Sequence, residues 1–316
     1  MTRSWRCPLP RCACIDIGSN TTRLLVAEGG QPRPRELFAE RAFTRLGSAL
    51  DLRGEIAAQK VAEVAAVVAR QVLLAREHGV DEPRIVATSA VRAAVNAAAL
   101  KEAVTSACGI ELDILSGEDE ARLAFAGAIG MLASAPPGRL GVVDVGGGST
   151  ELVVGSVEGG VTWSVSLPLG SCTVTDRDLP SDPPTAAELA RLRAKLARAF
   201  AGVRAPQPAT AYAVGGSATS LQRLVGNVLS TDTLSRGLQA LVTHPADDVA
   251  LALGLHAERA RLLPAGLLLL DAASRALNAP LQLAGGGLRE GVVMEQLARL
   301  GRGPGSHAGD LGNLPA

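Results

Sequence analysis

Aromatic residues are scarce in this sequence, and its charges cancel. Phe, Trp and Tyr together make up 2% of the 316 residues, so the stacking surfaces on which single-stranded nucleic acids bind are missing. The 31 Lys and Arg residues match the 31 Asp and Glu residues, so the chain has no overall positive field that would hold DNA or RNA. We therefore expect no nucleic-acid partner.

Long apolar runs are also absent. The apolar segment 262–270 is interrupted by Pro264 and Gly266 and falls short of the roughly 18 residues that a transmembrane helix needs. Residues 1–11 lack the apolar core of a signal peptide. These two absences predict a cytoplasmic protein without a membrane partner.

The five cysteines are odd in number, and a cytoplasmic chain keeps its thiols reduced. Cys7, Cys12 and Cys14 cluster near the N-terminus, but a fourth ligand for a metal is missing. Cys12 and Cys14 fall in a predicted strand, so we interpret them as small core residues.

Length and composition indicate a folded protein of about two domains. Hydrophobic residues make up 47% and charged residues 20% of the 316 residues, which argues against intrinsic disorder. Strand-like and helix-like patterns alternate, which predicts a mixed α/β fold. The ends of the chain, residues 1–11 and 301–316, are predicted to be flexible. The clearest predicted strands are 12–17, 85–88, 140–145 and 152–157, and the clearest helices are 55–78, 118–132 and 186–203.

The sequence contains an internal repeat. The segment 16–26 aligns without a gap on the segment 144–154, and most aligned positions keep the size and polarity of the side chain. A repeat at domain spacing indicates a duplication, and it predicts two equivalent turns on opposite walls of one cleft. The identical pairs are Asp16/Asp144, Gly18/Gly146, Thr22/Thr150 and Leu24/Leu152.

Each repeated turn joins two strands through small residues that suit phosphate binding. Glycine allows the backbone to approach a ligand closely, and consecutive N–H groups can form a concave anion site. The aspartate before each turn would repel a phosphate unless a cation lies between them, and Mg²⁺ bridging carboxylate and phosphate fulfils that condition. The residues that we assign to phosphate binding are Gly18, Ser19, Asn20 and Thr21 in the first turn and Gly146, Gly147, Gly148 and Ser149 in the second.

A third glycine turn, Gly215-Gly216-Ser217, begins a predicted helix, and a helix N-terminus attracts anions. It is therefore a further candidate for phosphate binding, although a strand-to-helix turn needs glycine in any case. The acidic segment 118–120 also lies at a helix start, where the helix dipole alone explains it. At this point the residues leave a kinase, an ATPase and a phosphatase open.

Seven motifs together resemble the exopolyphosphatase and guanosine-pentaphosphate phosphatase family, which belongs to the actin, sugar-kinase and Hsp70 superfamily. The resemblance covers residues 12–300, as in the short two-domain members, which counts against a preference for very long polyphosphate chains. The motifs are, in chain order, Asp16-Ile-Gly-Ser-Asn-Thr21, Ala87-Thr-Ser-Ala-Val-Arg92, Ser116-Gly-Glu-Asp-Glu-Ala-Arg122, Asp144-Val-Gly-Gly-Gly-Ser-Thr-Glu151, Leu167-Pro-Leu-Gly170, Gly215-Gly-Ser-Ala-Thr219 and Leu288-Arg-Glu-Gly291.

The resemblance implies two duplicated actin-like (ribonuclease H-like) α/β domains with a cleft between them. The first domain is expected to comprise residues 12–124 together with a C-terminal helix at about 288–300, and the second to comprise residues 125–287. A homodimer is expected from the family.

The resemblance also implies the roles of individual residues. Glu120 matches the general base that deprotonates the attacking water, and Arg92 matches an arginine that grips substrate phosphates. Asp144 and Glu151, with Asp16, match the metal-site carboxylates, and the expected metal is Mg²⁺, with Mn²⁺ as the alternative. The role of Arg23 is left open.

The function that the resemblance implies is release of terminal orthophosphate from inorganic polyphosphate. The first alternative is hydrolysis of the 5′ γ-phosphate of guanosine pentaphosphate (pppGpp), for which the sequence shows no clear guanine pocket. A non-hydrolytic actin-like nucleotide-binding module and an ADP-dependent phosphotransferase are alternatives of other classes.

Overall fold

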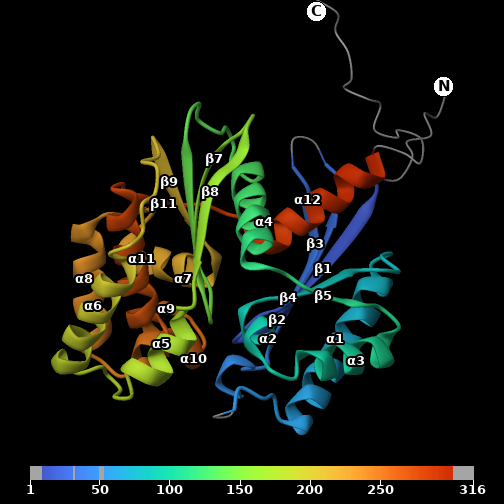
Figure 1. Cartoon of the computed structure of the whole chain (residues 1–316), viewed down its shortest axis with the longest axis horizontal. Coiled ribbons are helices and arrows are strands. Elements are labelled where there is room, and N and C mark those ends of the chain that lie inside the picture. The colour runs from blue at the N-terminus through green and yellow to red at the C-terminus, as the bar shows by residue number, and fades with distance from the viewer. Residues whose placement is uncertain (1–8, 31–32, 50–52, 302–316) are drawn as a thin grey trace, which may run out of the picture.

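The structure is a computed structural model that describes residues 9–30, 33–49 and 53–301. Most of the ends predicted to be flexible, residues 1–11 and 301–316, and Cys7 of the cysteine cluster lie outside these ranges. Figure 1 shows two α/β halves side by side, each built on its own sheet.

The sheet of the first half has the order β3-β2-β1-β4-β5. Strands β1, β2 and β3 pair antiparallel, whereas β4 and β5 continue the sheet parallel to β1. The strands are β1 (Arg11–Ile17), β2 (Thr21–Glu28), β3 (Arg35–Phe43), β4 (Arg84–Ala87) and β5 (Leu112–Ile114).

Helices cover this first sheet because they carry an apolar stripe. In α1 (Ala58–Glu77) the buried residues include Val61, Val64, Val68 and Val72, whose spacing puts them on one face of the helix. They pack in one core with the apolar residues of β1 and β2. The other elements of this half are η1 (Gly47–Ala49), α2 (Ser89–Ala93) and α3 (Ala97–Cys108).

The second half repeats the topology of the first. Its sheet has the order β10-β11-β9-β6-β7-β8, in which β6, β7 and β8 pair antiparallel and β9 and β11 run parallel to β6. The predicted duplication and the predicted fold class are therefore confirmed. The strands are β6 (Leu140–Val145), β7 (Thr150–Ser156), β8 (Gly160–Leu167), β9 (Thr210–Val214), β10 (Val228–Leu229) and β11 (Leu281–Leu283).

The helices of the second half surround α11 (Leu263–Leu277). Residues 267–270 of α11 are four consecutive buried leucines, as expected of a helix packed on several sides. None of the helices in the described part of the chain is both long and apolar enough to cross a membrane. The surrounding helices are α5 (Ser171–Asp178), α6 (Ala186–Phe200), α7 (Gly215–Val225), α8 (Thr231–Val242), α9 (Ala246–Leu253) and α10 (Ala257–Arg261).

Two helices, α4 (Gly117–Gly130) and α12 (Leu288–Gly301), lie against each other between the sheets (Figure 1). α4 packs on the second sheet through Phe125 and Ala128, and α12 packs on the first sheet through Val292 and Val293. The C-terminal helix thus returns to the first half. The proposed division between residues 124 and 125 falls inside α4.

Glycines allow α4 and α12 to touch backbone to backbone. A Cβ on Gly127 would lie 1.9 Å from the carbonyl oxygen of Gly287, and one on Gly291 would lie 2.0 Å from that of Leu123. No side chain fits at such distances, so these positions require glycine. The glycines at this contact, here called the glycine seam, therefore bring the two helix backbones into direct contact.

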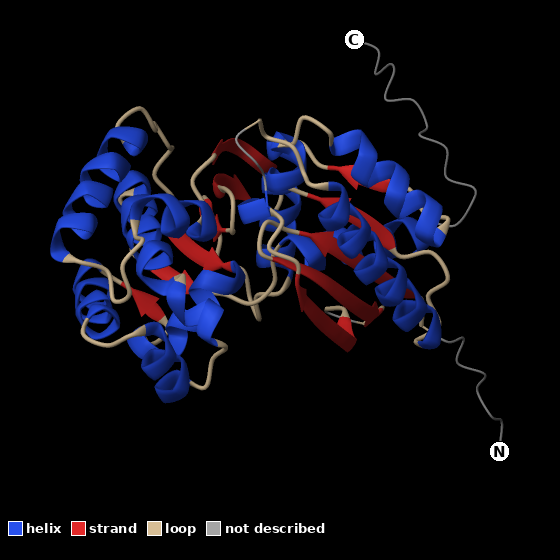
Figure 2. Cartoon of the chain, turned by 90° about the horizontal axis from the view of Figure 1, so that it is seen from below, coloured by secondary structure: helices blue, strands red, loops and turns tan. Residues whose placement is uncertain are grey.

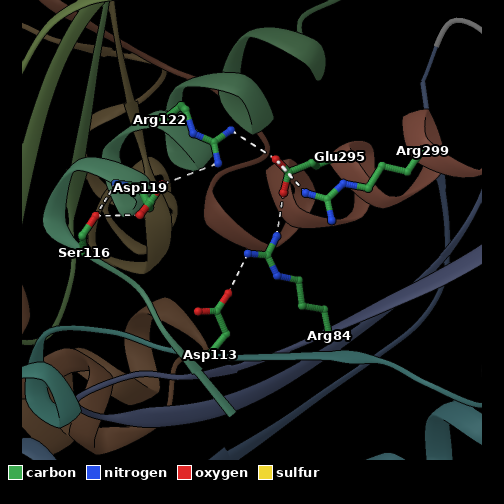
Figure 3. A network of polar contacts seen from close by, with 7 residues as sticks. All are labelled: Arg84, Asp113, Ser116, Asp119, Arg122, Glu295 and Arg299. Carbon is green, nitrogen blue, oxygen red and sulfur yellow. Dashed lines mark hydrogen bonds and ion pairs between the residues drawn. The ribbon is translucent and has the colours of Figure 1, made fainter. Parts of the chain in front are cut away.

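A polar network also holds α12 in place (Figure 3). Glu295 lies 2.6 Å from Arg84 of β4, 3.4 Å from Arg122 of α4 and 3.6 Å from Arg299 one turn further along α12. Isolated ion pairs at the surface contribute little to stability. Here, however, one carboxylate is shared, and it connects β4, α4 and α12. Together, the network and the glycine seam fix the position of α12 relative to β4 and α4, and with it the position of the first residues of α12. Figure 2 shows the two halves from below, with the region between them at the centre.

Candidate active site

The two repeated turns face each other, as the sequence predicts. Gly18 N donates to Thr21 O in the first turn, and Gly146 N donates to Ser149 O in the second, both at 3.0 Å. A Cβ on Gly147 would lie 3.1 Å from Cβ of Ser19. The turns of the two halves are therefore in contact, and they bound one cleft.

A cavity of about 120 Å³, here called the inner cavity, lies at this contact. The structure brings most of the predicted site residues to its wall. These are Asp16, Gly18, Ser19, Asn20, Thr21, Glu120, Asp144, Gly146, Gly147, Ser149, Glu151, Gly215 and Gly216.

Three predicted site residues lie elsewhere. Gly148 packs against the hydroxyl groups of Ser19 and Ser89, where a Cβ would lie 2.4 Å from each oxygen. Ser217 is buried within the first turn of α7. Arg92 does not line the inner cavity and instead lies beside Glu120.

Glu120 lies in the first turn of α4. The helix begins after Ser116, whose hydroxyl oxygen accepts a hydrogen bond of 3.0 Å from the backbone N–H of Asp119. Glu120 is 8% exposed and its Oε2 lies 3.0 Å from Nη1 of Arg92. The same Nη1 donates to the carbonyl oxygen of Leu115 at 2.8 Å, which fixes the guanidinium in place.

Burial raises the pKa of Glu120 to about 7, although Arg92 acts in the opposite direction and Asp16 and Asp144 add to the rise. A carboxylate with a pKa near the working pH is suited to general-base catalysis, because it is ionised in use and still takes up a proton readily. The structure therefore gives this one acid of segment 118–120 an environment that a helix dipole does not explain.

Three further carboxylates face the inner cavity. Burial, and then the charge of Asp16, raise the pKa of Asp144 to about 6. Burial also raises the pKa values of Asp16 and Glu151, the latter with a contribution from the charge of Glu120. Ser166 donates a hydrogen bond of 2.8 Å to Glu151. The raised pKa values mean that these side chains lack enough positive charge from the protein alone.

The carboxylates fit a hard divalent cation. Oδ1 of Asp16 is buried without a hydrogen-bond partner in the protein, and the available donors are carboxylate oxygens, which Mg²⁺ prefers. Among the described residues no three His, Cys, Asp or Glu side chains lie close enough to hold an ion alone. Mg²⁺ is commonly held by one or two carboxylates with phosphate oxygens and water as the other ligands, so this arrangement suits it.

Arginines from both halves also line the inner cavity. The guanidinium groups of Arg23 in β2 and Arg259 in α10 converge on Gly216, where a Cβ would lie 3.1 Å and 2.9 Å from their respective Nη2 atoms. Burial and the charges of Arg289, Arg41 and Arg259 lower the pKa of Arg23 to about 9. Within the described residues, Arg23, Arg41 and Arg259 form no ion pair with an acidic side chain. Arg259 is buried, Arg23 is half-buried, and both line the cavity, so guanidinium groups without an acidic partner at this place indicate an anionic ligand.

The comparison with known proteins agrees with this geometry. The family model of the Ppx/GppA phosphatase family matches residues 25–300. The chain belongs to the Ppx/GppA phosphatase family. It is 34% identical to "Exopolyphosphatase 1" of Mycobacterium tuberculosis over 91% of this chain and 88% of that one. It is 29% identical to the "Guanosine-5'-triphosphate,3'-diphosphate pyrophosphatase" of Photobacterium profundum, over 92% of this chain and 60% of that one.

A solved structure of the Ppx/GppA family confirms the fold. The crystal structure of the Aquifex aeolicus family member covers 95% of this chain and 100% of that chain with a TM-score of 0.78 and 27% sequence identity. The resemblance on which the fold and the site residues were predicted is therefore correct at the level of the family.

Sequence reasoning missed two arginines of this Ppx/GppA site. Arg289 stands in the motif Leu288-Arg-Glu-Gly291, so its position beside Glu290 at the start of α12 could have been assigned. Arg259 carries no local signal, because it reaches the cavity from the short helix α10. Cys12 and Cys14 are buried in β1 against α12, as interpreted.

Proposed function

We propose that this protein is an exopolyphosphatase that releases terminal orthophosphate from inorganic polyphosphate by in-line attack of water. The observation that carries the proposal is Glu120, a buried carboxylate with a pKa of about 7 at the junction of two opposed phosphate-type turns. The same cavity is lined by carboxylates and by arginines that form no ion pair with an acidic side chain among the described residues. Such a cavity suits a terminal phosphoanhydride.

The chain's own residues position the substrate and the water. The backbone N–H of Gly147 and the hydroxyl of Ser149 bind the terminal phosphoryl group, and the N–H of Gly146 holds the turn closed by donating to the carbonyl oxygen of Ser149. Arg23 and Arg259 neutralise charge on phosphates further along the chain. Glu120 accepts the proton of the attacking water and orients it.

Asp144, Glu151 and Asp16 would hold Mg²⁺, or alternatively Mn²⁺. When bound, the ion supplies charge neutralisation for the phosphoryl oxygens. We further propose that the protein acts in the cytoplasm as a homodimer.

Hydrolysis of pppGpp is the second candidate. It is supported by the named activity of the Photobacterium profundum relative, and it uses the same terminal phosphoanhydride. A phosphate-release assay with short polyphosphate, long polyphosphate and pppGpp separates the two substrates. ADP in the same assay tests for transfer to a nucleotide in place of release to water.

The variant Glu120→Gln tests the catalytic assignment. It keeps the shape of the side chain and removes its basicity, so phosphate release should fall by about 10²–10⁴-fold while polyphosphate still binds. Glu118→Gln, on the same helix and outside the inner cavity, is the matched control and should keep its activity. Full activity of Glu120→Gln would refute the assignment, and ATP binding without turnover of any polyphosphate would favour a nucleotide-binding module.

A further inference from the structure

Two pairs of side chains connect the first half to helix α10 of the second. The rings of Phe43, at the end of β3, and His256, at the start of α10, stack with their centroids 4.6 Å apart. Nε of Arg45 donates to Oε2 of Glu258 at 2.9 Å, and Nη2 of Arg45 contacts Oε1 of the same carboxylate. These four residues, Phe43, Arg45, His256 and Glu258, are here called the clasp.

In the first half, the clasp is attached to the first repeated turn. The backbone N–H groups of Thr44 and Arg45 both donate to the carbonyl oxygen of Asn20, at 3.1 Å and 2.9 Å. The N–H of Gly47 donates to the carbonyl oxygen of Ser19 at 2.7 Å. Arg45 has a φ of +46°, a left-handed conformation that residues other than glycine rarely adopt. The fold thus holds Arg45 in a strained conformation while its side chain reaches α10, and such strain is typical of functional positions.

In the second half, the clasp lies in the same helical turn as Arg259. His256 is the N-cap of α10, and its carbonyl oxygen accepts a hydrogen bond of 2.9 Å from the backbone N–H of Arg259. Glu258 directly precedes Arg259 in the chain. Because α10 has only five residues, its first turn makes up most of the helix. Contacts of the clasp therefore bear directly on the position of the Arg259 guanidinium, which lines the inner cavity.

The two halves are not closely packed beside the clasp. A cavity of about 560 Å³ lies there, lined by Ser19 and Asn20 of the first turn together with Arg45 and Glu258. Side-chain contacts across this cavity, in place of a shared core, determine how far the first turn lies from α10. An ion pair as exposed as this one, with Arg45 58% and Glu258 26% exposed, contributes little to stability. We therefore expect the clasp to affect the geometry of the site more than the stability of the fold.

We propose that the clasp positions the guanidinium group of Arg259 for binding of substrate phosphate. Its members are positioning residues, since they connect α10 to the first turn and line up the phosphate-binding groups of the two halves. The inference rests on the proposed function, in which the first turn and Arg259 bind phosphates of one chain. Groups from two halves bind a shared ligand more tightly when their spacing is fixed in advance, because no ordering has to accompany binding.

Reversal of one charge of the clasp tests the proposal. Arg45→Glu replaces attraction to Glu258 by repulsion, so the whole chain should bind inorganic pyrophosphate at least about fivefold more weakly in calorimetry. KM for polyphosphate should rise by a similar factor while kcat stays nearly unchanged, because the proposed role of Arg259 is to bind phosphates. The double variant Arg45→Glu/Glu258→Arg restores opposite charges and should recover most of the lost affinity.

Three further variants separate positioning from other effects. Arg45→Gly relieves the strain at φ +46°, so the midpoint of urea denaturation should not fall, whereas pyrophosphate should bind about threefold more weakly. In an Arg259→Gln background, Arg45→Glu should cause no further loss of pyrophosphate binding, because the group that it positions is gone. Arg35→Glu is the matched control. Arg35 pairs with Glu28 at 2.8 Å within the first sheet, so reversal of its charge should leave pyrophosphate binding unchanged.

Three results would overturn the inference. Unchanged pyrophosphate binding by Arg45→Glu would do so, as would a charge-swapped double variant that recovers no affinity. An equal loss in the Arg259→Gln background would show that the new charge acts on the ligand directly. Pyrophosphate binding needs no turnover, so the two proposals fail separately. A chain that shows the expected binding pattern and releases no phosphate fails only the proposed function, whereas one that hydrolyses polyphosphate equally well with Arg45→Glu fails only this inference.

Discussion

Arg92 donates a hydrogen bond of 3.0 Å from Nη1 to Oε2 of Glu120, from behind the inner cavity. The resemblance implied that Arg92 grips substrate phosphates, and the structure gives its guanidinium two partners within the protein, Glu120 and the carbonyl oxygen of Leu115. With these contacts Arg92 orients the carboxylate of Glu120, the residue that we propose as the base.

Replacement of Arg92 by Gln should therefore lower kcat and leave KM for polyphosphate nearly unchanged. Loss of orientation at a reacting group costs about 10–100-fold in rate. Arg23→Gln is the contrasting variant, since Arg23 lines the cavity and its loss should raise KM. Steady-state kinetics on both variants separate the roles, and a raised KM with normal kcat in Arg92→Gln would support the phosphate-binding role.

The activity should depend on pH through Glu120. Its pKa is raised to about 7, and a general base works only when ionised, so kcat/KM should fall as the pH drops below about 7 and level off above it. The raised pKa of Glu120 affects the free energy of unfolding in the opposite direction, because it makes the fold less stable as the pH rises. A carboxyl group whose folded pKa is raised stabilises the fold at low pH and loses that contribution as the pH rises through the folded value. A flat profile of kcat/KM between pH 5 and pH 8 would contradict this assignment.

The second turn, residues 146–149, should not tolerate a side chain at Gly170, which packs against it. A Cβ on Gly170 would lie 2.3 Å from the backbone of Gly147 and of Gly148, so Gly170→Ala must displace the turn 146–149, for which we propose phosphate binding. A displacement of about 1 Å typically costs about 10²-fold in rate. Gly202→Ala is the control, because a Cβ there meets nothing within 4 Å. Phosphate release from polyphosphate measures the difference, and equal rates for the two variants would show that the loop is adaptable.

The seam between α4 and α12 makes a prediction about stability. Gly127→Ala places a methyl group 1.9 Å from a backbone carbonyl oxygen, which only a separation of the helices can relieve. Overpacking of this kind costs about 1–3 kcal/mol, although alanine is intrinsically the better helix former. Urea denaturation should show a lower midpoint than for Gly202→Ala. An unchanged midpoint would mean that the helices separate at little cost.

The two hairpins show how far the duplication extends. Asp16 pairs across the strands with Arg23 in the first hairpin, and Asp144 pairs with Glu151 in the second. Directly paired residues point to the same side of a sheet. The first half therefore presents a guanidinium group where the second half presents a carboxylate, so the two duplicated hairpins differ in charge where they line the cavity.

The sequence alone determined the α/β class, the duplication, the opposed glycine turns and the family, because these depend on local patterns and on motifs of neighbouring residues. Only the tertiary structure decided how distant side chains combine. Glu120 acquires its raised pKa from burial against the second half, Arg92 meets Glu120 across 28 residues of chain, and Arg259 reaches Arg23 from a helix without any motif. The physical reason is that burial, charge proximity and close packing arise between segments far apart in the chain, and no local pattern records them.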